Sequence, residues 1–433
     1  MNIPFEKRTL RNGLDVIVHE DHRLPMVAVS VWYHVGSCNE VPGKTGFAHL
    51  FEHLMFEGSA HQPLSFFEPL QAAGGTANGS TSADRTDYWE VVPREAARRA
   101  LWMEADRMGW MLPVLTAARF ETQRGVVINE RRQNYENKPY GMAPFAIARA
   151  VYPPNHPYAW PPIGETADIQ AATLDDVHEF FRRYYHPANA SLAIGGDITP
   201  AEAFGLADEF FAEIPAGPAV APVVPPPVEP TAAGLVVEDR VDLPRLHLAW
   251  PTPPLFAEGD AELDLAADFI ATGRTSRLYR RLIHERRVAT EISASQSSRE
   301  LGGLFQIVAT AAPGVPLADV HEAILEELDT LRSTGPTSDE MERGRAQAEA
   351  TFVYRIQSLG GFGGRVDQLN AYNIYLGEPD SFDRDLARYR DATPQSVQET
   401  FRRWIEPHRA AVVSFVPEGR ADLAAAPASV SRS

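Results

Sequence analysis

The sequence contains a single cysteine, Cys38, so no disulfide can form within the chain. A disulfide-stabilised secreted domain is therefore excluded, and a lone thiol fits a reducing compartment. No stretch approaches the roughly eighteen uncharged apolar residues that a membrane-spanning helix needs, and the first residues lack the apolar core of a signal peptide. We therefore expect a cytoplasmic protein with no membrane partner. A trimmed signal peptide would leave no trace here, so a periplasmic location stays open.

Basic residues are also few, because 40 lysines and arginines stand against 58 aspartates and glutamates, for a formal net charge of −18. Nucleic acids and anionic membranes bind net basic surfaces, so neither is an expected partner. An acidic surface keeps a protein soluble and could also attract basic peptides. With 433 residues, of which 44% are hydrophobic, the chain exceeds the size of a single core, and we expect at least two domains.

Proline is concentrated in one stretch. Seven prolines and almost no charge lie between Pro215 and Pro230, a composition that indicates a stiff, extended linker between two globular units. We therefore predict an N-terminal domain over 1–214, which carries the catalytic residues discussed below, a proline-rich linker over 215–231, and a non-catalytic C-terminal domain over 232–433.

The two halves of the chain share a spaced pattern. The run Val-x-Glu-x-Phe-Arg-Arg at 177–183 returns at 397–403, displaced by 220 positions, and the proline and alanine that follow each copy keep the same offset. Leu24-Pro25 returns as Leu243-Pro244, displaced by 219 positions. A near-constant offset over such a distance predicts two copies of one α/β unit.

Periodicity and turn residues predict the elements of the first copy. Alternating apolar residues indicate a β-hairpin over 5–19, with its turn at Asn12-Gly13. Further strands are expected over 26–35, 76–93 and 190–195, and helices over 66–73, 94–111, 114–138, 173–185 and 200–214. The strand over 76–93 is polar in its first half. A polar strand at a sheet edge leaves backbone donors and acceptors free to pair with an extended peptide.

One short segment, 46–58, carries a candidate metal site. In a helix His49 and His53 stack one turn apart and Glu52 sits on the adjoining edge, so two imidazoles and a carboxylate converge outside the helix. Two neutral imidazoles suit zinc, and the glutamate can serve as a base beside it. His-x-x-Glu-His is the inverted zincin motif. A pattern this short also arises by chance, as a helix with two surface histidines.

On this motif and several others the sequence resembles the M16 peptidases, the family of pitrilysin, insulinase and the mitochondrial processing peptidase, and in particular its half-length bacterial members. The other motifs are Gly74-Gly75-Thr-Ala-Asn78, Arg124-Gly-Val-Val-Ile-Asn-Glu130, His156-Pro157-Tyr158, and Asn189-Ala190 with Gly196-Asp197. The resemblance covers essentially the whole chain. It implies an α/β (α+β) fold of two homologous units, each a mainly antiparallel sheet packed with helices.

The resemblance also implies which residues form the site. Glu130, which follows His53 by 77 positions, stands where the family has its third zinc ligand, so that His49, His53 and Glu130 would hold one Zn²⁺ per chain. Glu52 would be the catalytic base. The residues expected to form the edge strand that pairs with the substrate peptide are Asn78, Gly79, Ser80, Thr81 and Ser82.

This sequence departs from the family pattern in two places. Gln123 stands where the family usually has a second glutamate that supports the metal from the outer shell, and a glutamine brings no negative charge. Ile283 and Thr290 stand where relatives carry an arginine and a tyrosine that bind the substrate backbone. We therefore expect a heterodimer with a homologous subunit that lacks the zinc motif and supplies the arginine and tyrosine.

The interpretation favoured by these residues is a zinc-dependent peptidase that hydrolyses unfolded peptides or oligopeptides in an enclosed chamber. Two alternatives remain open. One is a non-catalytic structural subunit of a larger complex, which Gln123 favours and the intact His49, Glu52, His53 and Glu130 oppose. The other is a dedicated presequence-processing peptidase. The glycine-rich segment 359–364 is interpreted as a helix break or hinge rather than as a substrate sensor.

Overall fold

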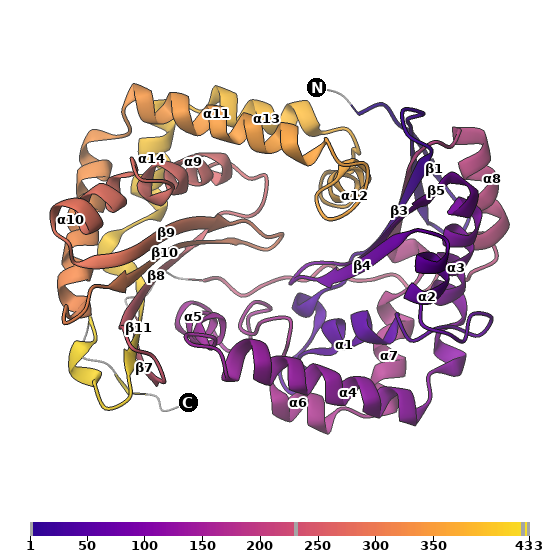
Figure 1. The fold of residues 1–433 in the computed structure, drawn as a ribbon, viewed down its shortest axis with the longest axis horizontal. Coiled ribbons are helices and arrows are strands. Elements are labelled where there is room, and N and C mark those ends of the chain that lie inside the picture. Colours follow the sequence, from indigo (N-terminus) through magenta and orange to yellow (C-terminus); the bar gives the residue numbers. More distant parts are fainter. Residues whose placement is uncertain (1–2, 229–232, 426–428, 431–433) are drawn as a thin grey trace. The chain divides into compact units, whose positions relative to one another are not determined.

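The strands of the N-terminal half form one six-stranded sheet, in the order β1-β2-β6-β3-β5-β4 (Figure 1). The computed structural model describes residues 3–228, 233–425 and 429–430 of the chain. The strands of this sheet are β1 (Glu6–Thr9), β2 (Asp15–Glu20), β3 (Met26–Tyr33), β4 (Thr76–Thr81), β5 (Thr86–Pro93) and β6 (Ala190–Gly196). Neighbours are antiparallel except β2 and β6, which run parallel. The predicted hairpin over 5–19 and the strands over 26–35 and 190–195 are confirmed.

The stretch 76–93, predicted as one strand, is instead a hairpin of two strands. The Ser82 N–H donates to the carbonyl of Arg85 at 2.8 Å. The Ser82 Oγ accepts from the backbone N–H groups of Asp84 at 3.2 Å and of Arg85 at 3.1 Å. A serine side chain that binds the following backbone N–H groups stabilises a turn, and this turn reverses the chain between β4 and β5. The polar half, β4, is the outermost strand of the sheet, as predicted.

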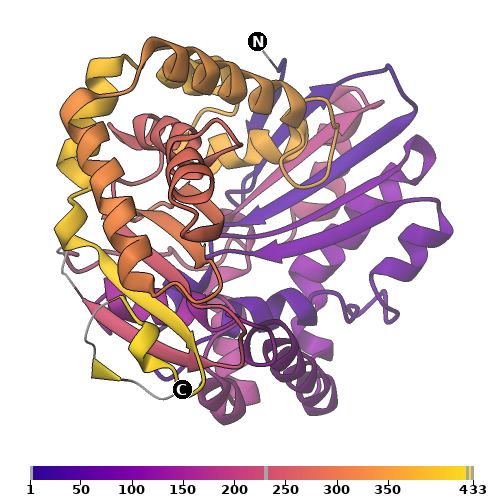
Figure 2. The ribbon, with the colours of Figure 1, turned by 60° about the vertical axis from the view of Figure 1, so that its left-hand side comes forward.

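Helices pack against this sheet, with α3 and α8 on one face and α12 on the other (Figure 1). The helices of the N-terminal half that belong to this unit are α1 (Phe47–Leu54), α2 (Phe67–Ala72), α3 (Ala97–Trp110), α4 (Ala117–Arg131), α6 (Thr166–Ala171), α7 (Leu174–Tyr184) and α8 (Pro200–Phe211). They confirm the helices predicted from periodicity, although α4 ends at Arg131 and continues only as a π-helical turn over Arg132–Glu136. In Figure 2 the later strand β6 lies among strands from the first hundred residues.

A second six-stranded sheet repeats the topology of the first, in the order β12-β7-β11-β8-β10-β9. Its strands are β7 (Gly234–Asp239), β8 (Arg245–Thr252), β9 (Ala289–Ser297), β10 (Gly303–Ala311), β11 (Ala411–Pro417) and β12 (Ser429–Val430). The pairing senses match at the inner strands, since β7 and β11 are parallel as β2 and β6 are, and β8, β10 and β9 pair antiparallel like their equivalents. The outer strand differs, because β12 runs parallel to β7 whereas β1 runs antiparallel to β2. The predicted pair of homologous units, each with a mainly antiparallel sheet, is confirmed.

The repeat extends to the helix that precedes β6 in the first sheet and β11 in the second. Helix α7 begins after Thr173 and α14 (Pro394–Trp404) begins after Thr393, and in both helices the threonine side chain accepts from the backbone N–H three residues later. A threonine at this position satisfies one of the free N–H groups at a helix start. The same residue, 220 positions apart, therefore starts the same helix in both units.

The compact units of the structure do not follow the sequence boundaries everywhere. The unit with the first sheet comprises 1–131, 160–223 and 351–384, and the unit with the second sheet comprises the remainder. Each unit thus contains a segment from the other half of the sequence. Helix α12 (Arg365–Leu376) belongs with the first sheet, and helix α5 (Ala143–Val151) belongs with the second. The predicted boundaries at 214 and 232 separate the two sequence copies. They place α5 and α12 in the wrong units, because α5 lies before the linker and α12 after it.

Buried polar contacts explain why α12 belongs with the first sheet. Asn370, which is fully buried, donates its Nδ2 to the Ser30 carbonyl at 2.9 Å and accepts from the Ser191 Oγ at 2.7 Å. The indole N–H of Trp32 donates to Asp367 at 2.7 Å. A buried polar group is costly unless it finds such a partner. These hydrogen bonds therefore fix the helix against strands that lie more than 170 positions earlier in the chain.

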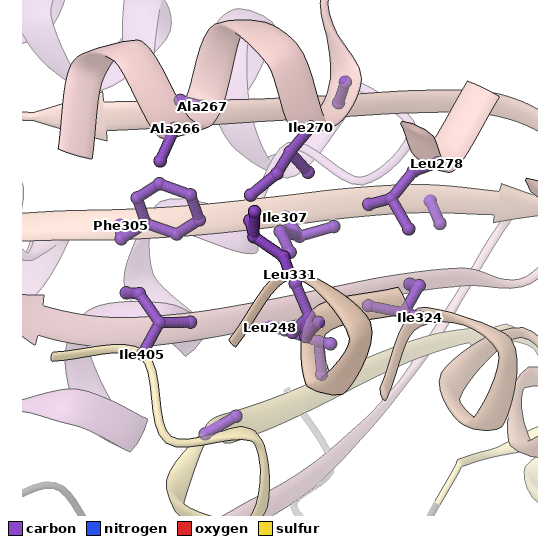
Figure 3. Close-up of a cluster of buried hydrophobic side chains, with 14 of the residues drawn as sticks. Leu248, Ala266, Ala267, Ile270, Leu278, Phe305, Ile307, Ile324, Leu331 and Ile405 are labelled. Atoms are coloured by element: carbon purple, nitrogen blue, oxygen red, sulfur yellow. The ribbon is translucent and has the colours of Figure 1, made fainter. Parts of the chain in front are cut away.

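The core of the second unit is formed by the sheet and by α9 (Asp260–Ala271) and α10 (Leu317–Thr334) (Figure 3). The labelled side chains come from both layers and from nearby turns: Leu248, Ala266, Ala267, Ile270, Leu278, Phe305, Ile307, Ile324, Leu331 and Ile405. Burying one leucine or isoleucine side chain stabilises a fold by about 1.5–3 kcal/mol. This unit therefore has a hydrophobic core of its own.

The remaining helices and the predicted linker complete the chain. Helices α11 (Ser338–Arg355) and α13 (Phe382–Asp391) each contain a boundary between the units. The glycine-rich segment 359–364 separates α11 from α12, as expected of a helix break. Residues 215–228 of the predicted linker contain neither helix nor strand, and 229–231 lie outside the described residues. Within the described parts of the chain, every helix is too short or too polar to span a bilayer.

The His156-Pro157-Tyr158 motif forms a buried corner of the second unit. His156 is 2% exposed, stacks on Tyr152, and accepts at Nδ1 from the backbone N–H of Tyr158 at 3.0 Å. An imidazole that accepts at Nδ1 in this corner must stay neutral. Burial, with a further contribution from the nearby Arg299, lowers the pKa of His156 to about 4.

We expect this histidine to make the fold acid-sensitive. Because its pKa is lower in the folded than in the unfolded chain, the unfolded chain takes up the proton first, and stability present above about pH 6.5 is lost as the pH falls toward 4. At pH 5 the loss should be on the order of 1–2 kcal/mol. His156→Asn keeps an acceptor but does not titrate, so melting curves between pH 7 and 5 should fall less steeply for the variant. Equal slopes would contradict this role.

Candidate active site

The helix that carries the two histidines is held at its start by a buried carboxylate. Glu40 accepts from the backbone N–H groups of Gly46 at 2.9 Å and Ala48 at 2.8 Å, and from the indole N–H of Trp160 at 3.1 Å. The first N–H groups of a helix have no partner within it, and the Glu40 side chain satisfies two of those at the start of α1. Glu40 therefore fixes the start and direction of α1.

The sequence of α1 divides it into an apolar face and a polar face. Phe47, Leu50, Phe51 and Leu54 are buried, and the rings of Phe51 and Phe180 stack with their centroids 5.6 Å apart. The spacing of these apolar residues leaves the motif residues on the opposite face.

The structure brings His49 and His53 together with Glu130, which lies at the end of α4. The Nε2 atom of His53 lies 3.3 Å from Oε2 of Glu130, and the Nε2 atom of His49 lies 3.7 Å from the same oxygen. One ligand atom from each residue lies within 4.8 Å of the others. A tetrahedral zinc with bonds of about 2.0–2.1 Å separates its ligand atoms by roughly 3.3–3.5 Å. The two distances to Glu130 are close to this spacing, and the donor types are those that zinc prefers.

The two histidines differ in their electrostatics. Burial, together with the neighbouring His53, lowers the pKa of His49 to about 4, so that its imidazole is neutral, the form that binds zinc. Burial alone would lower the pKa of His53, but its acceptors, above all the Glu130 carboxylate, outweigh burial and raise it. A zinc ion would therefore have to displace the proton that His53 shares with Glu130.

Glu52 lies beside this cluster and is held by the edge strand. The Thr81 Oγ1 donates to Oε2 of Glu52 at 2.7 Å. Burial raises the pKa of Glu52 above its ordinary value, although the Thr81 hydrogen bond lowers it in part. A carboxylate with a raised pKa takes up and releases a proton more readily near neutral pH, as a general base must.

The predicted substrate residues lie on the outermost strand of the first sheet or directly after it. Asn78, Gly79, Ser80 and Thr81 belong to β4, which pairs with β5 through Asn78 opposite Trp89 and Thr81 opposite Thr86. Ser82 begins the turn to β5. In the part of the chain that the structure describes, no strand pairs with the other edge of β4. The Thr81–Glu52 hydrogen bond joins the edge strand to α1, the helix that carries His49 and His53.

Gln123 lies beside the cluster and is held by a residue that the sequence did not single out. The Gln123 side chain is 8% exposed and is among the groups that raise the pKa of His53, after Glu130 and Glu52. Its Nε2 donates to Oε1 of Glu57 at 2.6 Å. Glu57 follows His53 by four positions, which is the spacing of one helical turn. That spacing was the only signal in the sequence that could have indicated it.

The positions that depart from the family pattern lie in the second unit. Ile283 belongs to the π-helical turn η6 (Tyr279–Glu285), and Thr290 belongs to β9. The nearby guanidinium of Arg286 is paired with Glu326. Neither Ile283 nor Thr290 carries a guanidinium or a phenol, so these positions cannot bind a peptide backbone as an arginine and a tyrosine would.

Two family models match successive parts of the chain. The family described as Insulinase (Peptidase family M16) matches residues 15–155, and the one described as Peptidase M16 inactive domain matches residues 171–348. His49, Glu52, His53 and Glu130 all lie within the first match.

Individual proteins show the same similarity. The zinc protease PqqE of Helicobacter pylori is 30% identical over 359 residues, which cover 82% of this chain and 80% of that protein. The crystal structure of a protease from Helicobacter pylori has a TM-score of 0.86 at 26% identity and covers 96% of this chain and 100% of that one. The periplasmic protease PqqL from Escherichia coli has a TM-score of 0.77 at 19% identity; the match covers 99% of this chain and 50% of PqqL.

Proposed function

Since this chain belongs to peptidase family M16, we propose that it is a zinc-dependent peptidase that hydrolyses peptide bonds in unfolded peptides. The observation that carries the proposal is the convergence of His49, His53 and Glu130 within 4.8 Å, with Glu52 beside them. A zinc ion held there would supply a Lewis acid for the carbonyl of the scissile bond and for water.

Glu52, Thr81 and β4 would then each have a separate role in the reaction. Glu52 takes a proton from the attacking water and passes it to the nitrogen of the leaving amine. Thr81 holds the Glu52 carboxylate in place from the edge strand. The free backbone edge of β4 binds the peptide as an added strand, so that only an extended, unfolded segment fits.

The partner is a second part of the proposal. Ile283 and Thr290 leave the second unit without the two groups expected to bind the substrate backbone, and the match to PqqL covers only half of that protein. We propose that this chain pairs with a homologous subunit that lacks the zinc motif and supplies an arginine and a tyrosine, and that the two chains enclose the substrate. A fully active monomer or homodimer would contradict this pairing.

A non-catalytic structural subunit is the competing function, and the absence of a negative charge on Gln123 is the observation that favours it. Metal analysis and peptide digestion separate the two. We expect about one zinc per chain and cleavage of a mixed peptide library by the chain together with its partner subunit. Removing the metal with a chelator should stop cleavage, and added Zn²⁺ should restore it. A chain that binds no zinc and cleaves nothing, alone or paired, would favour the structural subunit.

A further inference from the structure

The glycine-rich segment 359–364 separates two helices, and it also lies on one face of the first sheet, in the same compact unit. We propose that Phe362 of this segment forms, with Trp89 of β5, a subsite for a bulky apolar side chain of the bound peptide. This inference rests on the proposed function, because it takes β4 to bind the peptide as an added strand.

The segment crosses the sheet in the direction of β4. Leu359 lies against Gly196 of β6, and Gly360 lies against Ala28 of β3 and Val91 of β5. A Cβ atom on Gly360 would come within 2.7 Å of the Ala28 and Val91 side chains, so a glycine is needed for the backbone to lie this close to the strands. The strand order is β6-β3-β5-β4. Successive residues of the segment therefore approach the edge of the sheet.

Phe362 lies at the tip of the segment, against β5. Its ring meets the ring of Trp89 edge-on, with the centroids 5.5 Å apart and the planes at 89°, which is a favoured arrangement of two aromatic rings. The flanking Gly361 and Gly363 have φ values of 84° and 73°, in the left-handed region that favours glycine. The Gly363 N–H donates to Asp367 at 2.6 Å. The chain thus turns back after Phe362 and leaves this ring 50% exposed.

The aromatic pair borders the strand that is expected to bind the peptide. Trp89 lies opposite Asn78 of β4, and opposite residues of an antiparallel pair point to the same face of a sheet. Asn78 is exposed, so β4 is open to solvent on this face. Thr81 is three positions further along β4, so its side chain points to the other face, where it donates to Glu52. A peptide added to β4 would have Glu52 on one face and Phe362 on the other.

An added strand would direct every second side chain toward the aromatic pair. Neighbouring strands are about 4.8 Å apart, so a peptide paired with β4 would lie roughly 10 Å from β5. A serine or alanine side chain is too short to cross this gap over Asn78, whereas a phenylalanine or leucine side chain can reach the exposed half of the Phe362 ring. Phe362 is therefore a specificity-determining residue that favours peptides with a bulky apolar residue at this position.

The test uses two fluorescently labelled decapeptides of serine and alanine that differ at one central residue, phenylalanine in one and serine in the other. Their dissociation constants are measured by fluorescence anisotropy with the metal-free full chain, so that no cleavage interferes. The phenylalanine peptide should bind about 10-fold more tightly. Phe362→Ala should remove this difference without weakening the serine peptide, and Phe362→Leu should keep most of it. Tyr354→Ala removes a ring of α11 that is 69% exposed and is the matched control.

The ratio of the two dissociation constants separates the subsite from a structural role, because a partly unfolded variant would weaken both peptides equally. If the original chain shows no preference, or if Phe362→Ala leaves the ratio unchanged, the subsite is overturned and the peptidase proposal stands. If neither peptide binds, the subsite is overturned, and zinc binding and cleavage of the mixed library decide on the peptidase separately. A chain with the expected ratio that binds no zinc and cleaves nothing would keep the subsite and overturn the peptidase.

Discussion

Glu52→Gln is expected to abolish peptide hydrolysis while the chain keeps its zinc. The glutamine has the size of the glutamate and can still accept the hydrogen bond that Thr81 Oγ1 donates at 2.7 Å. It cannot take a proton from water, so kcat/KM for a fluorogenic peptide should fall by about 10³-fold or more. Zinc per chain, measured by elemental analysis, should not change, because Glu52 is not among the three clustered metal-binding groups.

Glu95→Gln is the matched control for this prediction. Glu95 is an exposed carboxylate outside the cluster, and Glu95→Gln makes the same chemical change there without an expected effect on kcat/KM. If Glu52→Gln retained more than about a tenth of the original activity, proton transfer by this residue would not be essential.

Glu130→Gln is expected to weaken zinc binding by more than about 100-fold and to lower activity in parallel. The substitution keeps the shape of the side chain but removes the anionic oxygen that lies 3.3 Å from His53 Nε2 and 3.7 Å from His49 Nε2. A neutral amide is a much weaker zinc ligand than a carboxylate. The measurement is chelator competition on the full chain, followed by kcat/KM at a zinc concentration that saturates the variant.

The matched control for this prediction lies on the same helix. Glu121 also belongs to α4, but its side chain is 58% exposed and pairs with Arg124. Glu121→Gln should leave zinc affinity unchanged. If both variants bound zinc as the original chain does, Glu130 would be a helix carboxylate without a role in metal binding, and a different third ligand would have to be sought.

Sequence periodicity predicted much of the first unit, because helices and strands are set by residues close together in the chain. The hairpin over 5–19 and the helix over 173–185 follow directly from alternation, turn residues and capping. The prediction failed at 76–93, where the chain reverses. The turn there depends on Ser82 and its backbone partners, and serine alone is a weak turn signal beside a run of β-formers.

The hydrogen bonds around His49, His53 and Glu130 could be predicted from the sequence only in part. Gln123 was identified through its place in the family pattern, but its bond to Glu57 joins residues 66 positions apart. The Thr81–Glu52 bond joins residues 29 positions apart. Neither bond follows from a local period, because each requires a strand or a second helix to pack against α1. Zinc binding by His49, His53 and Glu130 itself stays a prediction that the experiments above test.

By itself, the sequence determined that one helix presents His49, Glu52 and His53 on one side, because a period of 3.6 residues is a local property of the backbone. It also determined that the fold is built twice, since the offset of 220 positions preserves the same helix start in both units. Only the tertiary structure decided that Glu130 reaches the histidines and that α5 and α12 exchange units. Contacts between distant residues depend on how complementary surfaces pack and on which buried polar groups find partners, and no local pattern encodes either.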